Sequence, residues 1–199
     1  MSSPLLRAEI LYWQRFLSCC GLYAGKLDGK WGPITNAADL AYDQQCDVIA
    51  GQVVTFDQRS ERNIRTLQTP VQALCRQSLR KIRAAGFDAR ILSGTRTYAE
   101  QTALYRQGRF GNSGPIVTNA KAGSSWHNFG RAWDIGIFRA DGGYITDGPE
   151  YAQAAPHGKV AGVQWGGDWK KFKDRPHYQV VGDLDGLAAM RSEFESGGR

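Results

Sequence analysis

The amino-acid sequence predicts an α+β fold, in which a small antiparallel sheet with flanking helices follows a small helical module. Residues 5–20 and 61–85 carry apolar residues at the spacing of an amphipathic helix. Residues 132–138 and 177–181 are short β-prone stretches separated by a glycine-rich segment. Helices and antiparallel strands in separate runs are typical of α+β domains.

The N-terminal part of the chain is expected to form two helices joined by a loop. Gly21 is a stop signal for the first helix, over residues 5–20. Asp28-Gly29 and Gly32-Pro33 then predict turns. The second helix is expected from Thr35 onward.

The remaining elements follow in chain order. A connector is expected at 48–60, and Gly86 should end the amphipathic helix over 61–85. The other elements are a strand over 87–93, a helix over 97–107, a loop over 108–125, the two strands, and a weakly helical, frayed tail over 183–199. Four segments are therefore predicted: a helical module at 1–50, a connector at 51–60, the main domain at 61–185 and a C-terminal tail at 186–199.

Charge narrows the class of protein. The 199 residues include 25 Lys and Arg against 19 Asp and Glu, a net charge of +6 that favours an acidic partner. The basic residues are scattered and form no block, which argues against a dedicated nucleic-acid surface. We expect a monomer that binds no nucleic acid.

The N-terminus and the cysteines indicate the cellular compartment in which the protein is made. Residues 1–7 lack the basic and apolar regions of a signal peptide, and no apolar stretch is long enough to span a membrane. The sequence therefore predicts a protein made in the cytoplasm, without membrane insertion, that depends on other factors for release. The absence of a CxxC pair predicts buried or free thiols at all four cysteines, namely Cys19, Cys20, Cys46 and Cys75.

The segment from Ser125 to Asp134 carries the strongest chemical signal. His127 and Asp134 are candidate metal ligands, because an imidazole and a carboxylate suit zinc, which takes three protein ligands in catalytic sites. Gly130 lies between them, and a tight turn that feeds a strand could bring the two side chains together.

His177 is a better third ligand than His157. His177 begins a β-prone run directly after Pro176, whereas His157 lies in a flexible context and is expected to be exposed. Pro176 argues against a helical HExxH arrangement. Asp174 precedes His177 by three residues and could act on a water at the metal. On spacing alone, an ordinary polar His–Asp pair is the alternative.

The pattern SxHxxGxAxD followed by DxxH resembles the signature of the M15 zinc peptidases, which comprise D-alanyl-D-alanine carboxypeptidases and L-alanyl-D-glutamate peptidases. The segments 93–101, 165–169 and 172–179 are also similar to this family, and the last two resemble its branch of L-alanyl-D-glutamate endopeptidases and phage endolysins. The similarity spans about residues 57–181. The fixed positions of the signature are Ser125, His127, Gly130, Ala132, Asp134, Asp174 and His177.

The resemblance implies roles for five side chains. His127, Asp134 and His177 would hold Zn²⁺. Asp174 would act as general base and then as general acid. Arg96 would hold a substrate carbonyl or carboxylate and stabilise the oxyanion, with a structural salt bridge as its alternative role.

Three further side chains are expected to bind substrate. Gln101 lies in the family-like segment 93–101. Ser125 could instead orient a metal ligand, and Asp168 could instead serve the Gly-Gly-Asp turn.

Residues 7–47 resemble the small helical peptidoglycan-binding module of many wall hydrolases. The resemblance ends after Tyr42, and the alternative is a helical extension that packs on the catalytic domain. The matching positions are Gly21, Leu22, Tyr23, Asp28, Gly29, Trp31, Gly32, Pro33 and Thr35.

Together, these resemblances imply a zinc-dependent peptidoglycan endopeptidase that hydrolyses the L-Ala–D-Glu bond of the stem peptide. A phage endolysin that reaches the cell wall after release fits the expected absence of a signal peptide. The alternatives are a D-alanyl-D-alanine carboxypeptidase or dipeptidase of the same family, and a non-catalytic wall-binding protein.

Overall fold

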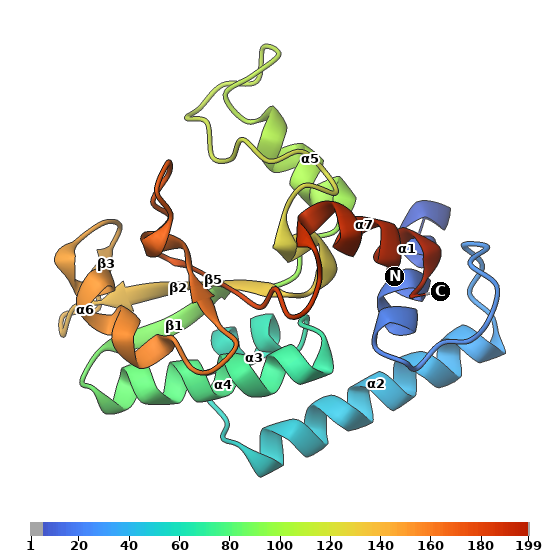
Figure 1. Ribbon diagram of the computed structural model, residues 1–199, viewed down its shortest axis with the longest axis horizontal. Coiled ribbons are helices and arrows are strands. Elements are labelled where there is room, and N and C mark those ends of the chain that lie inside the picture. Colours follow the sequence, from blue (N-terminus) through green and yellow to red (C-terminus); the bar gives the residue numbers. More distant parts are fainter. Residues whose placement is uncertain (1–5, 199) are drawn as a thin grey trace. The chain divides into compact units, whose positions relative to one another are not determined.

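The computed structural model describes residues 6–198, and its helices and strands confirm the α+β class (Figure 1). The sheet is small and antiparallel, as predicted. In chain order the elements are α1 (Arg7–Cys19), α2 (Pro33–Gln52), α3 (Gln58–Ile64), α4 (Thr69–Ala84), β1 (Asp88–Ser93), α5 (Tyr98–Arg106), the 3₁₀ helix η1 (Trp126–Phe129), β2 (Ala132–Phe138), β3 (Tyr144–Ile145), α6 (Pro149–Gly158), β4 (Gln164–Trp165), the 3₁₀ helix η2 (Gly166–Asp168), β5 (His177–Gln179) and α7 (Gly186–Ser196).

The described residues fall into two compact units. The first unit comprises the described residues up to Gln45, residues 96–129 and the described residues from Leu184. The second unit comprises residues 46–95 and 130–183. The division of the chain at residues 50, 60 and 185 stays a prediction.

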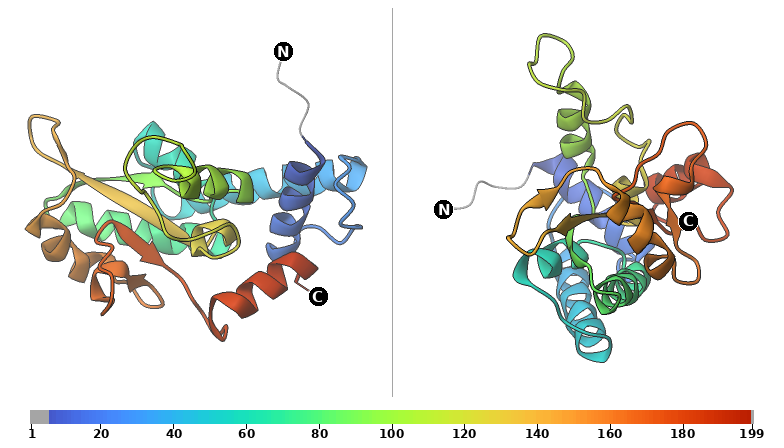
Figure 2. Two further views of the ribbon diagram at one scale, coloured as in Figure 1. Left: turned by 90° about the horizontal axis from the view of Figure 1, so that it is seen from above. Right: turned by 90° about the vertical axis from the view of Figure 1, so that its left-hand side faces the viewer.

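The second unit contains the sheet, with strand order β1-β2-β5-β4 and β3 paired to β2. Because side chains alternate along a strand, Trp133 and Ile135 of β2 and Ile91 of β1 share one face. These residues are buried in one apolar core with Leu79 and Ile82 of α4. Helix α4 therefore lies along this face of the sheet (Figures 1 and 2).

The opposite face of the sheet carries polar side chains. Asp134 of β2 pairs with His177 of β5, so the two side chains lie next to each other on the same face. Gln179 follows His177 by two residues and shares that face. Tyr178 lies between them in sequence, points the other way, and stacks on Trp133 at 6.0 Å between ring centroids.

The first unit is held together by aromatic side chains. Tyr12 of α1 packs against Phe194 of α7, with ring centroids 5.2 Å apart. Phe129 of η1 contacts Phe194 at the same separation, and Tyr12 also meets Tyr98 of α5 edge-on. Helices α1 and α7 therefore lie side by side (Figure 1). Within this unit, the N-terminal helix packs on segments that come much later in the sequence.

The expected helix over 61–85 is wrong, because two helices, α3 and α4, replace it. Pro70 lies in the first turn of α4, where its missing N–H costs nothing, whereas in the interior of one long helix it would remove a hydrogen bond and clash with the preceding turn. Asp57 caps α3 by accepting a hydrogen bond from the Ser60 N–H. The expected connector over 48–60 is wrong at both ends, since α2 continues to Gln52 and α3 begins at Gln58.

Three other expectations also differ from the structure. The glycine-rich segment between the two predicted strands contains α6, which includes Pro156 and was not predicted. The strand expected over 177–181 is β5, which ends at Gln179. The tail forms α7, with Met190 and Phe194 buried, so it is more ordered than the sequence indicated.

Other expectations are confirmed. No disulfide joins any of the four cysteines, and Cys46 and Cys75 are buried. His157 is exposed, although it lies on α6 rather than in a flexible segment. None of the helices among residues 6–198 combines the length and the apolar composition that a membrane span needs.

Candidate metal centre

Asp134 and His177 are brought together by the pairing of β2 with β5. The Asp134 carboxylate oxygen Oδ1 lies 3.2 Å from Nδ1 of His177. On its other side, Nε2 of the same imidazole lies 3.0 Å from Oε1 of Gln179. His177 is 6% exposed. The imidazole is thus fixed between two polar partners on one sheet face.

His127 lies in η1, the short 3₁₀ helix that precedes β2. Its side chain is buried, and its carbonyl accepts a hydrogen bond from the Arg96 N–H at 3.0 Å. Gly130 ends this segment at φ +68°, a left-handed conformation that side-chain-bearing residues rarely adopt. The turn predicted between His127 and Asp134 is therefore a glycine-terminated 3₁₀ helix leading into a strand.

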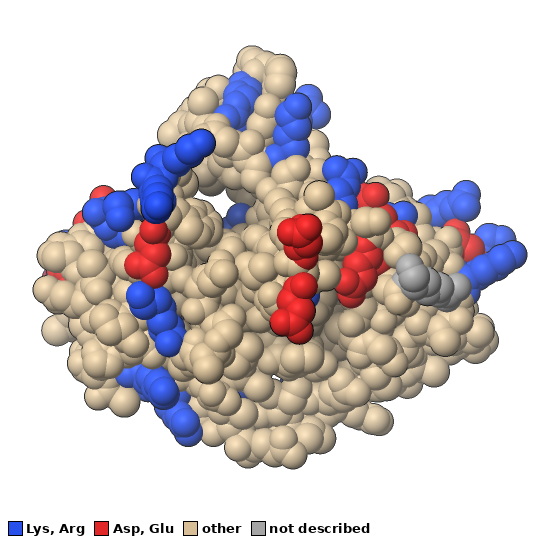
Figure 3. Space-filling model, viewed as in Figure 1, with Lys and Arg blue, Asp and Glu red and all other residues tan. Residues whose placement is uncertain are grey.

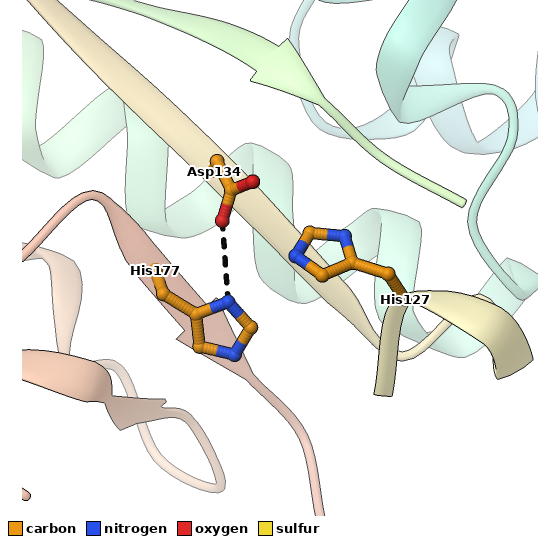
Figure 4. Close-up of side chains that lie close together, drawn as sticks. All are labelled: His127, Asp134 and His177. Carbon is orange, nitrogen blue, oxygen red and sulfur yellow. Dashed lines mark hydrogen bonds and ion pairs between the residues drawn. The ribbon is translucent and has the colours of Figure 1, made fainter. Parts of the chain in front are cut away.

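The ligand atoms of His127, Asp134 and His177 all lie within 4.8 Å of one another (Figure 4). Four-coordinate zinc with bonds of about 2.1 Å places its ligand atoms about 3.4 Å apart, so a modest contraction of this group would suit the ion. Two imidazoles and one carboxylate are a donor set found in catalytic zinc sites, which keep a fourth position open. The donors therefore fit a metal ion.

The surroundings of His177 have opposing effects on its pKa. Burial alone would lower the pKa of His177, whereas the hydrogen bond and charge of Asp134 and the charge of Asp174 raise it above its usual value. The site thus concentrates negative charge around a buried ring, which is the electrostatic setting that a cation would also favour.

Asp174 is held by its backbone in a half-buried position. Its N–H donates to the Gly166 carbonyl at 3.1 Å, and its own carbonyl accepts from the His177 N–H at 3.3 Å. A Cβ atom at Gly166 would lie 2.5 Å from the Asp174 carbonyl oxygen. The indole N–H of Trp165 donates to the Arg175 carbonyl at 2.7 Å. The absence of a side chain at Gly166 therefore allows residues 165–168 to lie close to the turn from Asp174 to His177.

Arg96 is anchored by its backbone to the segment that carries His127. The Asn128 side-chain amide donates to the Arg96 carbonyl at 2.9 Å, and its oxygen accepts from the Gly123 N–H at 3.0 Å. Asn128 is fully buried. It therefore fixes the backbone around Arg96 and His127.

The three predicted substrate-binding residues have different surroundings. Ser125 is half-buried, and its carbonyl accepts the Asn128 N–H at the start of η1. Asp168 is exposed and pairs with Lys159 at 3.0 Å. Gln101 is fully buried, and its amide donates to the Ala120 carbonyl at 2.8 Å. Their roles in binding substrate stay predictions.

The sequence reading missed three residues around the site. Gln179 contacts the His177 ring, Asn128 fixes the neighbouring backbone, and the Trp169 ring lies 5.1 Å from the His177 ring, inclined by 50°. The alternation of side chains along β5 could have indicated Gln179, two residues after a ligand candidate. Asn128 and Trp169 depend on loop geometry that no local pattern reveals.

Basic side chains gather over α5 and the loop that follows it. Residues 101–130 include Arg106, Arg109 and Lys121 and no acidic residue. Figure 3 shows blue side chains over this part of the first unit. The segment therefore carries a local positive charge suited to an anionic ligand.

A small antiparallel sheet with a His–Asp–His group has the composition of a metal-dependent hydrolase site. The comparisons agree with that class. Residues 118–180 match a peptidase M15 family model described as D-alanyl-D-alanine carboxypeptidase. This match confirms the resemblance to the M15 peptidases and supports a bound metal ion.

Two curated relatives carry endopeptidase or peptidase names. The peptidoglycan L-alanyl-D-glutamate endopeptidase CwlK of Bacillus subtilis (strain 168) is 39% identical over 105 residues, which cover 48% of this chain and 62% of CwlK. The L-alanyl-D-glutamate peptidase of Listeria phage A118 is 31% identical over 126 residues, which cover 61% of this chain and 40% of that protein. The chain thus spans less than two thirds of either relative.

Among solved structures, the crystal structure of the Serratia marcescens L-Ala D-Glu endopeptidase ChiX is similar to this chain. The sequence identity is 29% and the TM-score is 0.48, with 65% of this chain and 92% of that chain covered.

Proposed function

We propose that this protein is a zinc-dependent peptidoglycan endopeptidase that hydrolyses the L-Ala–D-Glu bond of the stem peptide. One observation carries the proposal: the three clustered donors His127, Asp134 and His177 all lie within the segment that matches the M15 family model. Asp174, the proposed general base, lies in the same segment. The names of the two curated relatives favour the L-Ala–D-Glu bond.

In this proposal, His127, Asp134 and His177 hold the zinc ion. When bound, zinc supplies a Lewis acid that polarises a carbonyl and lowers the pKa of water to about 7. Each histidine must offer a lone pair to the ion, so metal binding would displace any proton from the ring nitrogen that binds it.

Asp174 moves the proton. Its half-buried carboxylate accepts a proton from the attacking water and passes it to the departing amine nitrogen. The backbone hydrogen bonds to Gly166 and His177 fix the turn that carries Asp174. This fixed position limits the movement needed in each step.

Arg96 would bind a negatively charged group of the substrate. A guanidinium offers a planar fork of donors that matches a carboxylate, and the D-Glu residue of the stem carries one. Nearby basic residues in the segment 101–130 would attract the same anionic stem. These basic residues would therefore contribute to substrate capture, whereas Arg96 would also stabilise the oxyanion in the chemical step.

The description of the matched family model favours a second candidate, cleavage of the terminal D-Ala–D-Ala bond. The same metal donors, base and arginine would serve either bond, since D-Ala offers a terminal carboxylate. A non-catalytic wall-binding protein would leave the complete donor set without a role. Phage origin and release to the cell wall stay predictions.

Two synthetic stem peptides distinguish the candidates. One begins with L-Ala–D-Glu and the other ends with D-Ala–D-Ala, and mass spectrometry identifies the products. Release of L-Ala from the first peptide supports the proposal. Release of free D-Ala with an intact L-Ala–D-Glu bond supports the carboxypeptidase, and no cleavage of either peptide or of purified wall would count against both enzymes.

A further inference from the structure

Four polar side chains form a continuous line across one face of the sheet in the second unit. Asp134 and His177 are paired across β2 and β5, and Gln179 and Gln164 are paired across β5 and β4. His177 and Gln179 are two residues apart on β5 and so share the face. The register of three strands therefore aligns the whole line.

Each neighbouring pair in this line is within hydrogen-bonding distance. Oδ1 of Asp134 lies 3.2 Å from Nδ1 of His177, and Nε2 of His177 lies 3.0 Å from Oε1 of Gln179. The Gln179 amide nitrogen donates to Oε1 of Gln164 at 3.1 Å. Gln179 is 6% exposed, so breaking its bonds would leave buried polar atoms without partners.

The direction of the Gln179 amide favours a proton on Nε2 of His177. An amide oxygen only accepts, so its contact with Nε2 needs a proton on that nitrogen. The Asp134 carboxylate that faces Nδ1 also only accepts, so a metal ion held by Asp134 would take the place of a proton on Nδ1. The imidazole would then be neutral, with its proton on Nε2 and its lone pair on Nδ1.

Gln164 opposes reversal of this amide. A reversed Gln179 would direct its oxygen at Oε1 of Gln164, placing two acceptors together, unless the Gln164 amide turned as well. With both amides reversed, Gln179 would donate to Nε2 of His177, and the imidazole proton would move to Nδ1. That tautomer cannot offer Nδ1 to a metal.

We propose that Gln179, oriented by Gln164, is a positioning residue that fixes His177 in the Nε2–H tautomer and directs Nδ1 toward the metal beside Asp134. The proposal rests on the proposed metal-dependent function. Gln179 acts on the metal only through the imidazole. Partners of this kind orient a ligand and raise its basicity, and their loss typically weakens metal binding about 10–100-fold.

The first test measures zinc dissociation constants by competition with a chromophoric chelator. Gln179→Leu has a similar volume and removes the acceptor, so we expect zinc binding to weaken about 10–100-fold. Gln179→Glu keeps an acceptor facing Nε2 and should bind zinc within a few-fold of the wild type. The control Gln153→Leu, at an exposed position of α6, should leave binding unchanged.

The second test observes the imidazole directly. Nitrogen-15 NMR of the zinc-loaded full-length protein reports which ring nitrogen of His177 carries the proton. We expect a proton on Nε2 that exchanges slowly with solvent in the wild type and faster in Gln179→Leu. A purely structural role for Gln179 would change thermal stability without changing the exchange of this proton.

The outcomes separate this proposal from the proposed function. If the wild type binds zinc and folded Gln179→Leu binds it equally tightly, the positioning role is wrong and the metal site stands. If the wild type binds no zinc, the proposed function fails, and slow solvent exchange of the Nε2 proton in the metal-free wild type would still support the hydrogen bond between His177 and Gln179. Should Gln179→Leu fail to fold, the absence of a proton on Nε2 in the zinc-loaded wild type or a large loss of binding in Gln179→Glu would overturn the proposal.

Discussion

The hydroxyl of Tyr12 donates a hydrogen bond to the backbone carbonyl of Asn128 at 2.8 Å. Tyr12 belongs to the N-terminal helix, and Asn128 directly follows the metal-ligand candidate His127. The Asn128 side chain in turn donates to the Arg96 carbonyl. Within the first unit, α1 therefore belongs to the framework that fixes the backbone of two proposed site residues.

We expect Tyr12→Phe to lower the free energy of unfolding by about 1–3 kcal/mol, the usual cost of leaving a buried polar group without its partner. Tyr12 is buried, and burial raises the pKa of its hydroxyl well above the usual value. Urea unfolding monitored by circular dichroism measures the change. Tyr144→Phe is the control, because Tyr144 is exposed. Equal stability of the two variants would argue against a structural role for the Tyr12 hydroxyl.

The metal site predicts one zinc ion per chain. His127→Ala removes one of three protein donors, so the variant should lose most of its bound zinc under conditions that saturate the wild type. Elemental analysis after gel filtration measures the stoichiometry. His157→Ala should retain full zinc, because His157 is exposed on α6 and lies outside the cluster. Stoichiometric zinc in His127→Ala would remove His127 from the site.

Asp174→Asn should fold and retain zinc but lose at least about 10²–10⁴-fold in turnover, the range typical of a general acid–base group. The amide keeps the size of the side chain and cannot accept the proton. Turnover is measured on the stem peptide, beside zinc content and melting temperature. Asp183→Asn, at an exposed position, is the matched control. Near-wild-type turnover of Asp174→Asn would reassign the general base.

Asp57 caps helix α3, and its contribution to the stability of the fold should depend on pH. Burial would raise the pKa of Asp57, but hydrogen bonds from Ser60 and the hydrogen bond and charge of Arg83 lower it below the usual value. A carboxyl whose folded pKa is lowered stabilises the fold above its unfolded pKa of about 4, and this contribution is lost as the pH falls.

The expected cost of Asp57→Ala at pH 7 is therefore about 1 kcal/mol, the typical value of an N-cap. The difference from the wild type should shrink as the pH falls below about 4. Denaturant unfolding at several pH values measures both effects. A difference that stays constant down to pH 3 would show that the ionised carboxylate is not its source.

Features that have a signal in neighbouring residues were easier to predict than features that depend on residues far apart in the sequence. Strand β2 was predicted at its observed bounds, because alternation and the preceding Gly130 are local signals. The His127, Asp134, His177 group was predicted from a motif in which type and spacing are both fixed. The break between α3 and α4 was missed, although Pro70 marked it.

The contacts that were missed are long-range. Phe194 is buried against Tyr12, 182 positions away, so α7 could not be recognised as a packed helix from its own sequence. Gln179 was passed over because its partner Gln164 lies on another strand, and strand register depends on tertiary structure. Local patterns thus identified the metal donors, while their supporting residues depended on strand pairing.

The N-terminal module is proposed to bind peptidoglycan, and its exposed aromatic and apolar side chains provide the test. Trp31, just before α2, is 40% exposed, and Ile34, in the first turn of α2, is 61% exposed. Because α1 packs on α7 and η1, removing the module would disturb the whole first unit. Substitutions in the full-length chain therefore test binding more cleanly than an isolated segment.

We expect the double variant Trp31→Ser, Ile34→Ser to pellet less with insoluble wall and to hydrolyse whole walls more slowly, while its turnover of a soluble stem peptide stays unchanged. Tethering raises the local enzyme concentration at the polymer without altering the chemical step. Ile116→Ser and Val117→Ser, at exposed positions after α5, form the control pair. If the double variant and the control pellet like the wild type, the Trp31 surface does not bind wall. Loss of activity on both substrates would instead indicate that these side chains support the fold of the first unit.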